Sequence, residues 1–318
     1  MARRRAGHPR RQRQGARVAG KGEGVTVAPG DLITRPGQMQ YGGLLLGSGT
    51  PYRWRDVTGW EELPALDSGD VARSDAHGSL PGLLLAQART VGLVGLIIRA
   101  PRDRIGAVVG ALNGGTVPRA DEIPLVAWLD DRGPLLVHAR AVRRSVPVGP
   151  GFRLGTIVGG AVEWVASDPR RYAVGEQTVT ARLPAAEPGL TWPKTWPLNF
   201  GAPGSSGALV AMNAGDAPAH PVIEFRGPVT TPVLVNADTG DVLEYDIPLA
   251  AGDVLTVDTR AGTVLLNGGA SRLGTASNRS APEQVFALAP GINNLIFRAG
   301  PDSDPAATAT VRFRSAYW

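Results

Sequence analysis

The stretch Ala211–Val229 constrains most strongly what this chain can fold into. It starts at the end of one apolar run, turns through the polar residues 213–216, and enters a second run at Val222–Arg226. Asn, Gly and Asp accept positive φ angles, and the two prolines between the runs cannot lie inside a hydrogen-bonded ladder. Ile223 and Phe225 alternate with charged residues, the period of a strand with one dry face. The stretch therefore predicts a strand, a corner and a second strand.

Turn-forming residues recur along the whole chain, which has 42 Gly and 27 Pro among 318 residues. Many turn residues without long helical patterns indicate many short strands, and the length suits two domains. There is no cysteine, so neither a disulfide nor a thiolate metal site is possible. We therefore predict a mainly β protein of two domains.

Residues 208–318 have the pattern of one β-sandwich or jelly roll, because short alternating runs are separated by turn sequences at regular spacing. We predict nine strands there: Ala208–Met212, Val222–Arg226, Val233–Val235, Val242–Tyr245, Val254–Asp258, Thr263–Leu266, Gln284–Leu288, Asn294–Arg298 and Ala307–Arg314.

Residues 25–183 are expected to form a β domain with one helix. The helix is predicted at Pro101–Asn113, where apolar residues recur at helical spacing and Asp103 could cap the first turn. A hairpin is predicted at Ile123–Arg144, with one wet face that carries His138 and Arg140. Further strands are expected at Thr156–Ala166 and Glu176–Leu183.

Two segments are expected to lie outside these domains. Residues 1–24 hold eight of the 33 basic residues and one of the 28 acidic residues, so the rest of the chain has a net charge of −2. Because these residues lack hydrophobic periodicity, they are expected to form a basic flexible arm. The alternatives are an arm that binds nucleic acid non-specifically and an arm that becomes ordered against a neighbouring subunit. Residues 184–207 are a Pro/Gly-rich linker whose aromatics, Trp192 and Trp196 among them, could dock it onto a domain.

Polar residues that could suggest an enzyme are better explained as turns. Ser74, Asp75 and His77 are crowded into four positions, whereas a catalytic triad is assembled in space by the fold. Asp130 and Asp131 lie together at a predicted turn tip, where carboxylates are normally solvated. There is no Walker loop, dinucleotide-binding motif or nucleophile elbow. We predict no enzymatic activity and no catalytic or cofactor-binding residues.

A metal site is not predicted either, since the four histidines (His8, His77, His138 and His220) share no ligand spacing. Tyr52, Trp54 and Trp60, with arginines between them, could form a nucleic-acid or sugar site, but packing is favoured because large aromatics mostly serve cores. The longest apolar run, at 91–98, is too short to span a bilayer, so no membrane partner is expected.

Three segments in the last third of the chain resemble one known family: NAGDAPAHPVIEFRGPVTTPVLVNADTG, LEYDIPLAAGDVLTVDTRAGTVLLNG and LAPGINNLIFRAG. In their order of turns and strands they are similar to the C-terminal domain of siphophage distal tail proteins. The middle of the chain matches more weakly, at the Arg89-Thr-Val91 step and at Ala166–Tyr172.

The resemblance implies a galectin-like C-terminal sandwich and an N-terminal, β-sandwich-like domain that forms a hexameric ring. It also implies a location at the phage tail tip and a lumen that passes DNA. The partners implied are the chain itself, the tail tube protein and the tail-tip hub protein, with the tape measure and receptor-binding proteins as further candidates; sequence-specific nucleic acid is not among them.

A second function class is a carbohydrate-binding module that recognises the host surface. Such sites stack a sugar on an exposed aromatic ring, and the last domain has few: Phe225, Tyr245, Phe286, Phe297, Phe313, Tyr317 and Trp318. Phe225, Phe297 and Phe313 are at positions expected to point inward, which favours the adaptor.

Overall fold

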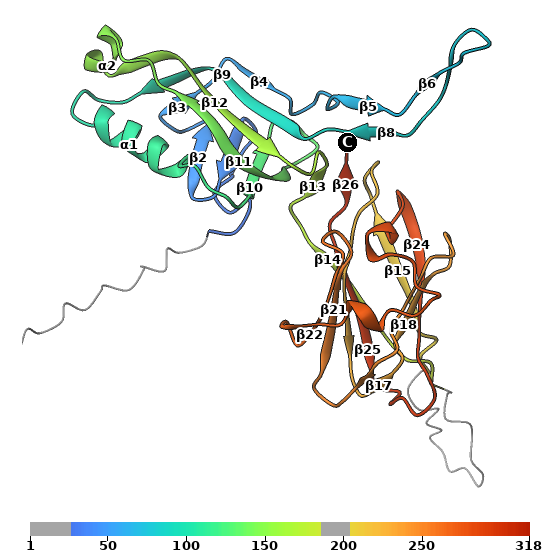
Figure 1. Cartoon of the computed structure of the whole chain (residues 1–318). Helices are drawn as coiled ribbons and strands as arrows, with labels where there is room; N and C mark the ends of the chain where they lie inside the picture. Colours follow the sequence, from blue (N-terminus) through green and yellow to red (C-terminus); the bar gives the residue numbers. More distant parts are fainter. Residues whose placement is uncertain (1–26, 186–203) are drawn as a thin grey trace, which may run out of the picture.

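The computed structural model describes residues 27–185 and 204–318, which form two β domains (Figure 1). The mainly β fold class predicted from the sequence is confirmed. The predicted basic arm at 1–24 and most of the predicted linker, with Trp192 and Trp196, lie outside the described residues.

The N-terminal domain is built on one curled antiparallel sheet with the strand order β2-β1-β10-β11-β12-β9-β3. β2 and β3 follow each other closely in the chain and also contact each other, so the two ends of this path meet and the sheet is nearly a barrel. The strands are β1 (Gln38–Tyr41), β2 (Leu44–Gly47), β3 (Tyr52–Arg53), β4 (Asp56–Thr58), β9 (Arg89–Arg99), β10 (Ile123–Trp128), β11 (Leu135–Ser145), β12 (Thr156–Ala166) and β13 (Arg171–Ala173).

Helix α1 (Ile105–Gly115) packs against this sheet through Ile105, Val109 and Leu112. It starts four residues later than predicted, and Asp103 does not cap it: the N-cap is Arg104, which makes no side-chain capping bond. A second, short helix, α2 (Pro150–Leu154), was not predicted. It ends at Gly155, whose φ of 81° suits a glycine at a helix C-terminus.

The predicted aromatic packing is confirmed, because Tyr52 and Trp60 are buried in the N-terminal core and Trp54 packs against it. The predicted hairpin is also confirmed as β10 and β11. The wet face predicted for β11 is wrong in its first half. Leu136 is buried on that side, and with Val126 it packs into the core of the C-terminal domain.

The C-terminal domain is a sandwich of two sheets, with the orders β14-β25-β16-β21-β22-β23 and β15-β24-β18-β19. Phe225, Phe297 and Phe313 are buried between them, as predicted. The strands are β14 (Gln177–Arg182), β15 (Ala208–Asn213), β16 (Val222–Arg226), β17 (Val229–Thr230), β18 (Val233–Asn236), β19 (Val242–Glu244), β20 (Pro248–Leu249), β21 (Val254–Asp258), β22 (Thr263–Leu266), β23 (Ala270–Ser271), β24 (Gly291–Arg298), β25 (Thr308–Phe313) and β26 (Ala316–Tyr317).

Two strand predictions differ from the structure. The strand expected at Gln284–Leu288 is a 3₁₀ turn, Glu283–Val285, followed by a single bridge from Leu288 to Ala219. Glu176–Leu183, expected in the N-terminal domain, contains β14, which pairs along its full length with β25 of the sandwich. The C-terminal sandwich therefore takes in a strand from before the predicted linker.

The two domains are joined by backbone pairing as well as by the chain. β26 leaves the sandwich and pairs with β13, which itself pairs with β11 of the N-terminal sheet. Neither α1 nor α2, the α-helices of the described residues, is long and apolar enough to cross a membrane.

The position of β14 predicts how the C-terminal domain behaves alone. A segment covering 176–318 should melt cooperatively, and a segment covering 208–318 should melt at least about 5 °C lower, roughly the effect of 1 kcal/mol in a domain of this size. The reason is that loss of β14 leaves β25 as an exposed edge and uncovers Ala181, which is buried. Thermal unfolding by circular dichroism measures this, and equal melting temperatures would contradict it.

Candidate interaction surfaces

The residues that could have formed a catalytic triad lie at the tip of an exposed turn. Ser74, Asp75 and His77 connect β6 (Val71–Ala72) to β7 (Ser79–Leu80), and all three are exposed. Asp131 is exposed in the β10–β11 turn, while Asp130 is ion-paired with Arg132. Neither Ser74, Asp75, His77 nor Asp131 lines a cavity described below, and Asp130 lines only the small one beside Glu61.

The three histidines within the described residues do not gather. His77 is at the turn tip, while His138 and His220 lie between the two domains; His8 lies outside the described residues. Across 27–185 and 204–318 there is no group of three His, Asp or Glu residues that could hold a metal ion.

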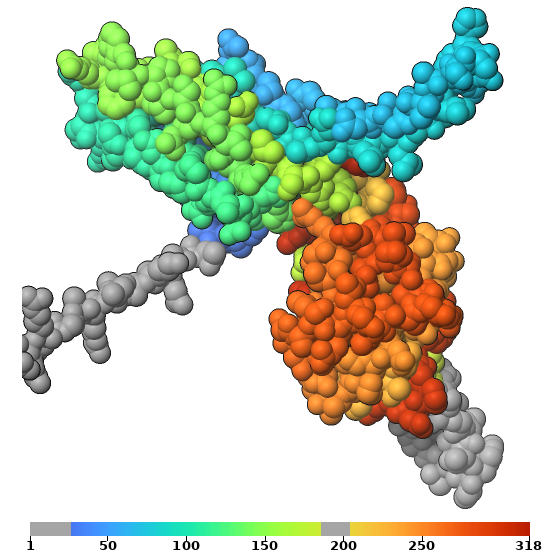
Figure 2. Space-filling model, in the orientation of Figure 1, coloured from blue at the N-terminus to red at the C-terminus, as the bar shows by residue number. Residues whose placement is uncertain are grey.

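The most exposed apolar surface is a two-stranded extension, here called the ribbon, formed by Leu63–Gln87. In it β5 (Leu66–Ser68) pairs with β8 (Leu84–Ala86), and β6 pairs with β7. Figures 1 and 2 show it projecting from one end of the N-terminal domain. Seven large apolar side chains on it are exposed: Leu63, Leu66, Val71, Leu80, Leu83, Leu84 and Leu85.

A two-stranded ribbon cannot bury these side chains against itself, since a core needs a second layer. Leu83 is 79% exposed and Leu84 is 64% exposed. Leaving two large apolar side chains in water costs free energy. Contiguous apolar surface of this kind marks a protein contact. We therefore identify the ribbon as a candidate interaction surface.

The base of the ribbon is fixed by a buried arginine. Arg89, only 1% exposed, donates hydrogen bonds to the carbonyl oxygens of Gly59 (2.7 Å), Trp60 (3.0 Å), Glu62 (2.8 Å) and Pro169 (2.6 Å). Burial, together with the charge of Arg171, lowers the pKa of Arg89 to about 10, so its guanidinium stays charged at neutral pH. One side chain thus holds both chain segments that leave the domain to form the ribbon.

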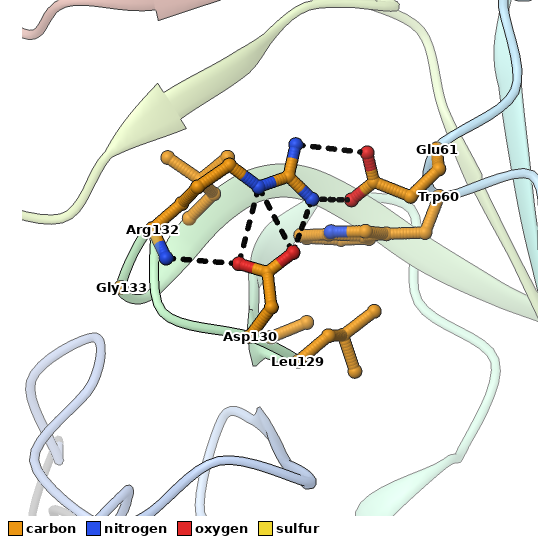
Figure 3. Close-up of a pocket in the computed structure, with 8 residues that line it drawn as sticks. Trp60, Glu61, Leu129, Asp130, Arg132 and Gly133 are labelled. Carbon is orange, nitrogen blue, oxygen red and sulfur yellow. Dashed lines mark hydrogen bonds and ion pairs between the residues drawn. The ribbon is translucent and has the colours of Figure 1, made fainter.

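A second set of charges surrounds the same base (Figure 3). The Glu61 carboxylate lies 2.9 Å from Arg132 and 3.0 Å from Arg171, and Arg132 also pairs with Asp130. Burial alone would raise the pKa of Glu61, but its hydrogen bonds to the two arginines outweigh burial and hold that pKa below its usual value. The cavity beside these residues measures about 10 Å³, room for one water at most. This cluster is therefore a clamp on the ribbon and not a ligand site.

A second exposed apolar surface, here called the α2 patch, lies at the other end of the N-terminal domain. It consists of Val142 on β11, Val148 and Leu154 around α2, and Val158 on β12, which are 53%, 83%, 67% and 59% exposed. Figure 1 shows α2 and the ribbon at opposite ends of the domain. One copy of the chain therefore has exposed apolar side chains at two opposite ends of its N-terminal domain.

The domain junction carries a buried polar cluster centred on Asp168. This carboxylate pairs with Arg170 (2.9 Å) of its own turn and with Arg260 (3.3 Å) of the sandwich, and it accepts a hydrogen bond from Tyr172 (2.6 Å). Arg170 also donates to the carbonyl of Pro218 (3.0 Å) in the sandwich. The cluster ties the angle between the domains to charge pairs as well as to the β13–β26 pairing.

Few aromatic rings in the sandwich are available to stack on a sugar. Tyr245 and Phe286 are fully buried, and the Tyr245 hydroxyl bonds to Glu283 (3.1 Å). Among the aromatics of residues 208–318 only Trp318 is exposed, at 37%. No observation here favours a carbohydrate module over an adaptor.

The clamp at the ribbon base makes a testable prediction. Glu61→Gln should lower the free energy of unfolding by about 1 kcal/mol, because it removes the counter-charge of Arg171, which is 7% exposed, at a site only partly screened by solvent. It should also speed tryptic cleavage at Arg73 in the ribbon. Urea denaturation and timed proteolysis measure the two effects. Glu62→Gln, at the exposed neighbour, is the control, and equal behaviour of both variants would refute the clamp.

Comparisons with known proteins agree with this geometry. Residues 214–317 match the family model for the siphovirus-type tail component, C-terminal domain. The crystal structure of phage SPP1 Dit, described as a paradigm of the hub adsorption apparatus in phages that infect Gram-positive bacteria, aligns with a TM-score of 0.61 and 14% identity. That alignment covers 88% of this chain and 99% of the Dit chain.

Two structures of the phage P2 baseplate in its activated conformation, with Ca and with Sr, align with TM-scores of 0.48 and 0.47 and identities of 9% and 8%. Both alignments cover 86% of this chain, and they cover 97% and 96% of the baseplate chains. No curated protein sequence matches. The resemblance found in the sequence is thus confirmed: residues 214–317 match the siphovirus-type tail component, C-terminal domain, and the chain has the fold of a siphophage distal tail protein.

Proposed function

We propose that this chain is a structural adaptor of a phage tail tip. It assembles through its N-terminal domain into a closed ring of six copies, which joins the tail tube to the tail-tip hub and leaves a lumen for DNA. The observation that carries the proposal is that a single alignment with SPP1 Dit covers 88% of this chain, with parts of both domains, and 99% of the Dit chain. The proposed activity is assembly, without catalysis.

The two apolar surfaces of the N-terminal domain support assembly into a ring. A contact between the ribbon of one copy and the α2 patch of the next would be head-to-tail, because the two surfaces lie at opposite ends of the domain. A head-to-tail contact repeats until the rotation closes, and a closed ring leaves no surface unpaired. Each copy would bury both of its apolar surfaces in this way.

The sandwich is free for other contacts in such a ring. Five of its seven aromatics are buried in its core, so its loops are the parts left to meet other tail proteins. Weak contacts by each copy add up when several copies are held in one ring. The hub and receptor-binding proteins are the partners we propose for these loops.

Electron microscopy and native mass spectrometry of the purified chain test the proposal. Rings with an open centre and a mass of six copies are expected, either in free protein or on the ends of purified tail tubes. A protein that stays monomeric at all concentrations and does not bind tail tube ends would contradict the adaptor function.

A substitution in the ribbon tests the proposed contact between copies directly. Leu84→Asp should abolish ring formation in light scattering, because it places a charge in the proposed contact, while the melting temperature should hardly change at so exposed a site. Leu273→Asp, at a leucine 45% exposed on the sandwich, is the matched control and should leave rings intact.

Val158→Asp in the α2 patch should give the same loss. A mixture of the Leu84→Asp and Val158→Asp proteins should form dimers and no rings, since only one intact ribbon can meet one intact patch. Rings formed by the Leu84→Asp protein, or a mixture that stays monomeric, would refute this pairing of surfaces.

A further inference from the structure

A cavity of about 110 Å³ lies between the two domains, apart from the surfaces discussed above. The N-terminal domain contributes His138 of β11 and Tyr172 of β13. The sandwich contributes His220 before β16, Arg260 after β21, and Arg312 and Arg314 at the end of β25. Neither domain could form this cavity alone, because its basic side chains come from both sides of the junction.

Three nitrogens of these side chains are buried without a partner. His138 Nδ1, His220 Nδ1 and Arg312 Nε are each shielded from solvent, and none has a hydrogen-bond partner within residues 27–185 and 204–318. A buried polar atom without a partner costs free energy, so native proteins leave only a few. All three belong to side chains that line the cavity, so its walls have hydrogen-bonding capacity that residues 27–185 and 204–318 do not use.

The charges around the cavity indicate the sign of the charge that a bound group should carry. Three arginines line it, and the one carboxylate among its lining residues, Glu176, is exposed. Arg312 pairs with Glu224 (2.8 Å) outside the cavity, and Arg260 pairs with Asp168 (3.3 Å). A guanidinium has five N–H donors, so these bonds leave donors on each arginine for a further acceptor.

The pKa values of the two histidines are affected by the same surrounding charges. Burial, followed by nearby arginines, lowers the pKa of both His138 and His220, so both are neutral at pH 7. The charged groups that act on them come from every surrounding element: Arg260, Arg314, Glu122 and Asp168 on His138, and Arg170, Asp168, Arg260 and Asp258 on His220.

We propose that this cavity binds a small tetrahedral oxyanion of the phosphate class, which bridges the two domains. Such an anion accepts several hydrogen bonds at once, as the arginine donors and the two imidazoles together could supply. The volume, about 110 Å³, suits a single group of this size. A bound anion would add a contact between β11 and the sandwich and so stiffen the angle between the domains.

Binding should be linked to protons. The pKa values of both histidines are depressed in the free protein, and a neighbouring anion favours the charged imidazole. Anion binding should therefore take up protons, and the affinity should rise as the pH falls below about 6.5, the ordinary histidine pKa. Above pH 7.5 both histidines are neutral in the free protein, and the affinity should be at its weakest.

Titration calorimetry of the full chain with inorganic phosphate, and with sulfate, whose charge does not change between pH 6 and pH 8, tests the proposal at both pH values, with sodium chloride at equal ionic strength as the reference. For sulfate we expect binding at least about tenfold tighter at pH 6, with proton uptake by the protein seen as a dependence of the heat on the buffer. Phosphate that acts no better than chloride at both values would overturn the proposal. Acetate bound as tightly as phosphate would overturn the tetrahedral class.

Variants locate the site. His220→Gln should remove most of the pH dependence, and Arg312→Gln should weaken phosphate binding about tenfold, the effect of losing one charge-assisted hydrogen bond. His77→Gln and Arg140→Gln, at exposed positions elsewhere, are the matched controls and should bind like the unaltered chain.

A measurement on the unaltered chain covers the case in which a variant fails to fold. The imidazole NMR signals of His138 and His220 should shift on addition of phosphate, while the signal of His77 should not. Equal shifts of all three, or none, would overturn the proposal. Since the readout is local, it is independent of whether the chain forms rings.

Discussion

The structure depends most on one piece of backbone pairing, between β26 at the end of the chain and β13 at the end of the N-terminal sheet. Through β13 the pairing extends to β11, so one sheet runs from the first domain into the last strand of the second. The sandwich is thereby held against β10 and β11, where Val126 and Leu136 complete its core. Two domains that share core residues in this way lie at a defined angle, because rotation would expose apolar surface.

Arg171 connects this junction to the surface proposed for assembly. It lies on β13, donates to the carbonyl of Trp318, and pairs with Glu61 at the base of the ribbon. Arg89, buried beside it, fixes the neighbouring carbonyls. The direction of the ribbon and the angle of the sandwich are therefore set by adjacent side chains. The adaptor proposed here, with one surface for its neighbours and another for other tail proteins, would gain its geometry from this centre.

Local elements of the fold were predictable where the pattern and the turn chemistry agree. β16, β21 and β22 have the bounds that alternation and Gly-containing turns predict. Gln284–Leu288 has the composition of a strand, but Pro282 and the turn that follows it leave only a single bridge at Leu288. The exposure of the ribbon was not predictable, because Leu83–Leu85 look like part of a core strand in sequence; a strand is exposed or buried according to whether a second layer covers it.

The sequence by itself determined that this chain is a β protein of short strands, that it carries no cysteine or motif-based catalytic site, and that its last third resembles a known tail component. These properties depend on residues that are close to one another in the chain, so hydrophobic periodicity and turn propensity are enough to predict them. Only the tertiary structure decided that β14 joins the sandwich, that Tyr245 is unavailable to a ligand, and that His138 and His220 line one cavity at the junction. Those outcomes depend on contacts between segments far apart in the chain, and a local pattern specifies a strand without specifying its partner.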